Sequence, residues 1–75
     1  MSNVQAQLIN DLRKIGAVNI ERVESIGDNK ELYRYSKDGI PMSAVFLCTG
    51  SSYICIGANL REKEDALVEH MKNII

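Results

Sequence analysis

The sequence predicts an α+β domain in the order α-β-β-β-β-α, with a four-stranded antiparallel meander sheet and both helices packed on one face. Three observations lead to this fold class. Apolar residues recur at helical spacing near both ends of the chain, and runs rich in Val, Ile and Tyr lie between them. Short turn clusters separate these runs, which favours consecutive hairpins. The 75 residues have the length of one small domain, so we predict a single domain over 1–75.

The first helix is predicted over residues 2–15. Ser2 and Gln5 fit a capping box, in which each side chain satisfies a backbone N–H of the other residue. Gly16 suits the position after the helix because glycine adopts positive φ without strain. The apolar stripe consists of Val4, Leu8, Leu12 and Ile15, widened by Ile9.

Four strands follow, and turn chemistry separates them. Asp38-Gly39 is a strong signal for a two-residue type I′ hairpin, and residues 27–30 and 49–52 are turn clusters. In the first strand Val18 and Val23 differ in parity, which predicts a bulge near residues 21–22. The predicted strands are residues 18–26, 31–37, 40–48 and 53–58.

The last helix is predicted to begin after Asn59. Asn59 and Glu62 again fit a capping box, and negative charge in the first turn suits the helix dipole. The apolar stripe of this helix consists of Leu60, Leu67, Met71 and Ile74, widened by Val68 and Ile75.

The two hairpin turns predict the register, and residues paired directly across two strands project to the same face. We therefore place Tyr33 opposite Ala44, and Phe46 opposite Cys55. One face then gathers Tyr33, Tyr35, Met42, Ala44, Phe46, Cys48, Tyr53 and Cys55. The other gathers Leu32, Val45, Leu47, Ile54, Ile56 and Ala58, with Arg34 and Ser43 toward one end.

The segment 40–58 is therefore apolar on both faces, whereas a strand with one buried face alternates apolar and polar residues. We expect the two helices of so short a chain to cover only one face. Since the helix stripes are aliphatic, we assign them to the aliphatic face and leave the aromatic face open. The alternative is that the aromatic face is the core and the aliphatic face is partly exposed. The predicted interface residues are the anchors Tyr33, Tyr35, Phe46 and Tyr53, the adaptable Met42, and the rim charges Arg34 and Lys37.

Composition argues against several classes of function. The net charge of −1 is too small for an obvious electrostatic footprint on nucleic acid. We find no catalytic or metal-binding motif, and His70 lacks a partner at useful spacing, so we expect neither an enzyme nor a cofactor or small-molecule site. Cys48 and Cys55 are diagonal neighbours in the predicted register, too far apart for a disulfide. We expect a cytoplasmic protein with no membrane segment, because no signal peptide or apolar span is visible.

The order helix, meander, helix resembles that of double-stranded-RNA-binding domains, and residues 21–30 are loosely similar to the first strand and loop of that family. The chain departs from the family by an extra strand, residues 53–58. It also has a mixed, net acidic segment, 59–65, where the family has a basic cluster. The resemblance implies an alternative function of nucleic-acid binding. Its residues would be Lys30, Arg34 and Lys37, with Tyr33 and Tyr35 available for stacking.

We favour the interpretation that the chain is a small non-enzymatic protein-binding module, acting as a regulator, an inhibitor or an adaptor. The apolar aromatic sheet face would bury itself against a protein partner or a second copy of the chain, giving a homodimer. Oligomerisation is also a common source of stability in domains of this size.

Overall fold

The computed structural model describes residues 3–74 and has the predicted element order, two helices around a four-stranded antiparallel meander. The strands follow one another across the sheet in the order β1-β2-β3-β4, so β1 and β4 are the edges. The α+β class and the meander are confirmed. The elements are α1 (Asn3–Lys14), β1 (Val18–Gly27), β2 (Lys30–Lys37), β3 (Ile40–Cys48), β4 (Tyr53–Leu60), the short 3-10 helix η1 (Arg61–Lys63) and α2 (Glu64–Lys72).

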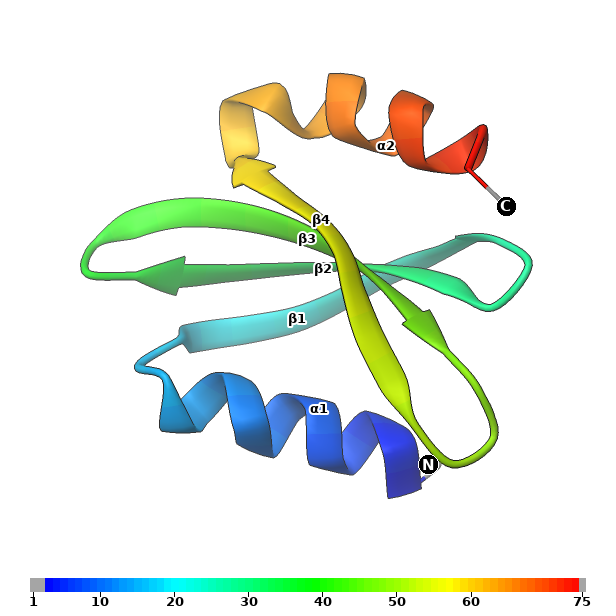
Figure 1. The fold of residues 1–75 in the computed structure, drawn as a ribbon. Coiled ribbons are helices and arrows are strands. Elements are labelled where there is room, and N and C mark those ends of the chain that lie inside the picture. Colours follow the sequence, from blue (N-terminus) through cyan, green and yellow to red (C-terminus); the bar gives the residue numbers. More distant parts are fainter. Residues whose placement is uncertain (1–2, 75) are drawn as a thin grey trace.

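The helices lie on opposite faces of the sheet, so the prediction that both pack on one face is wrong (Figure 1). Leu8 and Leu12 of α1 pack against the aromatic face, while Leu67 and Met71 of α2 pack against the aliphatic face. The sheet is thus the middle layer of three. Its apolar character on both faces needs no second chain, because each face has its own helix.

The predicted register is confirmed in both hairpins that carry it. Tyr33 pairs with Ala44 across β2 and β3, and Phe46 pairs with Cys55 across β3 and β4. Asp38 and Gly39 have φ of 54° and 77°, the positive values that a type I′ turn requires at both central residues. Turn chemistry alone therefore placed the side chains of this hairpin on the correct faces.

Bulges modify the two edge strands. β1 shifts register between Val18 and Glu21 and at two later places, so the predicted bulge is one of three irregularities. In β4, Phe46 pairs with Cys55 but Val45 pairs with Gly57, which leaves Ile56 as an extra residue. This bulge was not predicted. It turns Ala58 to the aromatic face opposite Ala44, so the assignment of Ala58 to the aliphatic face is wrong.

The ends of the helices differ from the capping predictions. The predicted capping residue Ser2 lies outside the described residues. Asn59 does not cap the last helix, because β4 continues to Leu60 and neither η1 nor α2 has a side-chain cap. The Asn59 Oδ1 instead accepts a hydrogen bond from the Leu60 N–H at 2.8 Å. Gly16 follows α1 with φ of 96°, as predicted.

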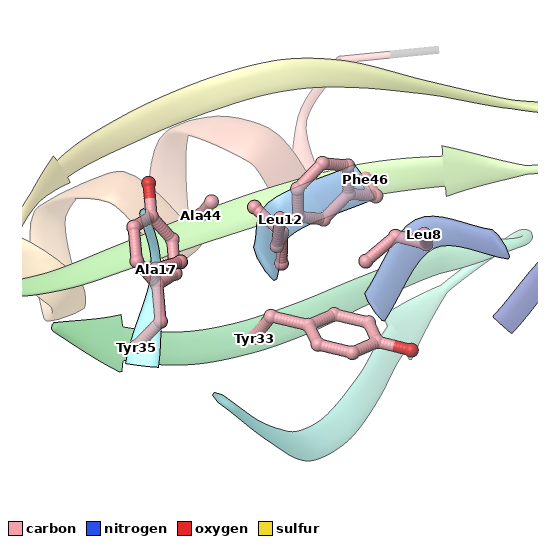
Figure 2. Close-up of a cluster of buried hydrophobic side chains, with 7 residues drawn as sticks. All are labelled: Leu8, Leu12, Ala17, Tyr33, Tyr35, Ala44 and Phe46. Carbon is pink, nitrogen blue, oxygen red and sulfur yellow. The ribbon is translucent and has the colours of Figure 1, made fainter. Parts of the chain in front are cut away.

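The core on the α1 side is aromatic. Tyr33 is fully buried, and its ring meets that of Phe46 edge to face with centroids 5.6 Å apart. Figure 2 shows Leu8 and Leu12 of α1 lying over these rings. The whole buried cluster is Leu8, Leu12, Ala17, Tyr33, Tyr35, Ala44 and Phe46.

The core on the α2 side is aliphatic and is built on a close approach at Gly57. A Cβ at this position would lie 3.0 Å from both Leu67 Cδ1 and Met71 Sδ, so only glycine lets α2 sit this close to β4. The buried Lys30 holds the C-terminal end of the helix, because its Nζ donates to the carbonyls of Met71 (3.0 Å) and Ile74. Cations suit this position, because the last carbonyls of a helix carry partial negative charge.

Candidate protein-binding edge

The sheet has two edges, and they differ in how far they are protected against pairing with another strand. An edge strand presents a row of backbone N–H and C=O groups without a sheet partner, which charges, prolines and bulges keep from pairing with another chain. β1 carries both charges and bulges. Its three register shifts bend the strand, and Glu21, Arg22 and Glu24 are exposed along it.

β4 has weaker protection. Its eight residues, Tyr53–Leu60, include no charged side chain and no proline, and the Ile56 bulge is its only irregularity against β3 among the described residues. Its exposed side chains include Ile54, which is 61% exposed, and Leu60, which is 40% exposed. Such a strand is a template for β-augmentation, in which an added strand gains main-chain hydrogen bonds.

An apolar groove runs beside β4 on the α1 face. It lies between α1 and the strand, with a volume of about 250 Å³, and Ile15 at its rim is 55% exposed. The lining residues are Asp11, Leu12, Ile15, Tyr35, Phe46, Tyr53 and Cys55. Of the six large apolar residues that are most exposed in the described chain, Ile54 and Leu60 belong to β4 and Ile15 lines this groove. We call the β4 edge together with this groove the β4 surface. Leu60 projects to its α1 side, where the groove lies, and Ile54 projects to its α2 side.

Tyr53 links β4 to α1, the helix that forms one side of the groove. The Tyr53 hydroxyl of β4 donates a hydrogen bond to Asp11 Oδ2 of α1. This bond to a carboxylate, with partial burial, raises the pKa of Tyr53 to about 12. The Tyr53 ring also meets Phe46 edge to face at 5.8 Å. One wall of the groove is therefore held in place before any partner arrives.

The predicted aromatic interface lies beneath α1. Tyr33, Tyr35 and Phe46 are buried against Leu8 and Leu12 of α1, so they do not form an open sheet face. The assignment of the aromatic face as the open one is therefore wrong, because α1 covers it. Tyr53 and Met42 are half-buried at the margin of the same cluster. Tyr53 is the least buried of the three predicted anchors that line the groove, the other two being Tyr35 and Phe46.

The predicted basic residues have separate positions and partners. Arg34 donates to both carboxylate oxygens of Glu64 at 2.8 and 2.7 Å, and Ser43 Oγ donates to Oε1 of the same residue at 2.6 Å. These bonds hold the pKa of Glu64 down at about 2, with the Arg34 bond the largest cause. Lys30 is buried under α2, which leaves Lys37 as the exposed member of the three. The bonds from Lys30, Arg34 and Ser43 therefore attach α2 to β2 and β3.

The remaining reactive side chains are dispersed. Cys48 and Cys55 are free thiols, and burial raises the pKa of Cys48, which disfavours its thiolate. Within residues 3–74, no group of three or more His, Cys, Asp or Glu could hold a metal ion. His70 is exposed on α2. Neither described helix has the length and apolar character needed to cross a bilayer.

Sequence reasoning missed the β4 surface because it weighed faces and gave the edges little attention. A signal was present, since the run 53–60 is uncharged and free of proline whereas the run 18–27 holds three charges. Comparison with protein-family models, curated proteins and solved structures finds no match to this chain.

Proposed function

We propose that the chain is a small non-enzymatic protein-binding module of the cytoplasm, a regulator, inhibitor or adaptor, that associates through the β4 surface and forms a homodimer by strand addition. The contrast between the two sheet edges carries this proposal. β1 has charges and repeated bulges, whereas β4 is uncharged, exposes Ile54 and borders an apolar groove.

Two physical arguments favour the β4 edge, and not a face of the sheet, as the element that binds a partner. Strand addition supplies main-chain hydrogen bonds, and exposed apolar side chains beside the strand add buried area. Burying Ile15, Ile54 and Leu60 would also stabilise a domain whose two cores are small. No observation favours the nucleic-acid alternative, because Lys30 and Arg34 are engaged with α2 while Tyr33 and Tyr35 are buried.

The test uses matched charge substitutions at the two edges. Ile54→Lys places a charge on β4, and Val18→Lys does the same on β1, where Val18 is 55% exposed. We expect light scattering coupled to size exclusion to give twice the 8.4 kDa chain mass for the natural chain and for Val18→Lys. Ile54→Lys should give the single-chain mass with an unchanged circular dichroism spectrum.

Two results would overturn the proposal. A natural chain that stays at 8.4 kDa up to millimolar concentration would mean that β4 does not pair with a second copy. A dimer that Val18→Lys disrupts, while Ile54→Lys leaves it intact, would assign association to the β1 edge.

A further inference from the structure

We propose that two copies pair β4 against β4 about a two-fold axis between Ile56 and Gly57, and that Leu60 of each copy closes the groove beside Tyr53 of the other. This inference rests on the proposed function and names the register and the occupant of the groove. It follows from the Ile56 bulge, the exposed apolar residues and the position of the groove.

The bulge limits the registers that two β4 strands can adopt. Residues paired across antiparallel strands must project to the same face. Before the bulge Tyr53 and Cys55 project to the α1 face, and after it Ala58 and Leu60 do, because they pair with Cys48, Phe46, Ala44 and Met42 in turn. A regular strand would have put residues 55 and 58 on opposite faces.

One antiparallel register therefore pairs all eight residues of β4 with matching faces. Residue 53 lies opposite 60, 54 opposite 59, 55 opposite 58, and 56 opposite 57. Moving the second strand by two residues in either direction places a residue of the α1 face against one of the α2 face at the bulge. Shorter overlaps would use only half of the strand.

The side chains of this register are complementary on the α1 face. The small Cys55 lies opposite the small Ala58, and both are exposed in the single chain. Leu60, 40% exposed, comes to lie beside Tyr53, at the groove whose far rim is Ile15. The two-fold axis repeats each contact, so the surface is self-complementary, as an isologous interface requires. The occupant that we assign to the groove is Leu60 of a second copy.

Disulfide trapping tests the register. Ala58→Cys, made together with Cys48→Ser, places a thiol opposite Cys55 of the second copy, within the Cα separation that a disulfide spans. Within one strand the bulge brings residues 55 and 58 to the spacing of their partners Phe46 and Ala44, roughly 7 Å, which is at the upper limit of what a disulfide spans. The mass of the unreduced product therefore separates a link between two chains from a link within one. We expect mild oxidation to link two chains through residues 55 and 58, identified by peptide mass spectrometry.

Two matched chains complete this experiment. Asn59→Cys projects its thiol to the other face and should not link to Cys55, and Cys48→Ser alone should also stay unlinked. Linkage of Cys48→Ser through Cys55 alone would show a different register. A dimer that Ile54→Lys disrupts but Ala58→Cys does not trap would overturn this inference and leave the proposed function standing. A monomeric natural chain would overturn both.

Affinity tests the seating of Leu60. Leu60→Ala and Ile15→Ala should each raise the dimer dissociation constant about tenfold, because each removes buried apolar area. The double substitution should raise the dissociation constant by clearly less than the product of the two separate effects, because both side chains form the same contact. Val18→Ala is the control, with an expected change below twofold. Independent effects of Leu60 and Ile15 would show that Leu60 does not close the groove.

Discussion

The two faces of the sheet are covered by helices that are held in different ways. On one face α1 packs on aromatic rings, and its described polar ties to the strands include Tyr53 to Asp11 and Gln5 to Glu31. On the other face α2 packs on aliphatic side chains, and Gly57 brings it close to β4. Charged bonds from Arg34 and Lys30 fasten its two ends.

This difference explains where the open apolar surface lies. Because Gly57 has no side chain, Leu67 and Met71 of α2 reach directly over β4. On the opposite face α1 leaves the groove between itself and β4, lined by Ile15 and Cys55 among others. The groove beside β4 therefore lies on the α1 face, and four predictions test the comparison of the faces.

The largest effect is expected from the aromatic face. Phe46→Ala removes a buried ring that touches both Tyr33 and Tyr53, and it should lower the free energy of unfolding by about 3–5 kcal/mol. Val45→Ala, at the neighbouring buried position under α2, should cost about 2 kcal/mol, because fewer carbon atoms are lost. Urea denaturation measures both. Equal losses would show that the two faces contribute alike.

The charged tie on the α2 face should appear as a dependence of stability on pH. The Glu64 pKa is about 2 in the fold and 4.5 without the fold, so its stabilising contribution is present above pH 4.5 and is lost as pH falls toward 2. Glu64→Gln should lower the unfolding free energy at pH 7 by about 2 kcal/mol and flatten this acid limb. Denaturation between pH 2 and 7 measures it.

The control for this change is Glu69→Gln, an exposed carboxylate of the same helix, which should stay within about 0.5 kcal/mol of the natural chain at pH 7. If Glu64→Gln keeps the full acid limb, the bonds from Arg34 and Ser43 do not stabilise the fold as described.

The close approach of α2 predicts a smaller cost at Gly57. Gly57→Ala adds a methyl group 3.0 Å from Leu67 and Met71, which must shift, at a cost of about 1–2 kcal/mol. Gly50→Ala is the matched control, because a Cβ there meets nothing within 4 Å. Thermal unfolding of both variants would decide, and equal midpoints would mean that α2 has room to move away from β4.

The smallest effect is expected at a buried hydroxyl on the α1 face. Tyr33 Oη is buried without a hydrogen-bond partner among residues 3–74. Tyr33→Phe removes a group that loses its contact with water on folding, so stability should stay equal or rise by up to about 1 kcal/mol. A loss above that size in urea denaturation would reveal a partner for the hydroxyl.

Residue types and their spacing were enough to predict the meander and the faces of most side chains. Asp38-Gly39 allows one tight turn, and the residues beside such a turn pair in a single register, which places Tyr33 with Ala44 and Phe46 with Cys55. These relations are local or link neighbouring strands, so residue types and spacing are enough to predict them. The uncharged run 53–60 was also a signal that β4 is the less protected edge, although it was not used to predict the site.

Which helix covers which face became clear only from the packing of the whole chain. Both helix stripes are aliphatic, so no property of Leu8 or Leu67 directs one to the aromatic rings and the other to the aliphatic face. Gly57 lies where Leu67 and Met71 of α2 approach β4, and Lys30 gains its role from carbonyls more than forty residues away. Such contacts join distant parts of the chain, and their free energy exists only once the layers are packed.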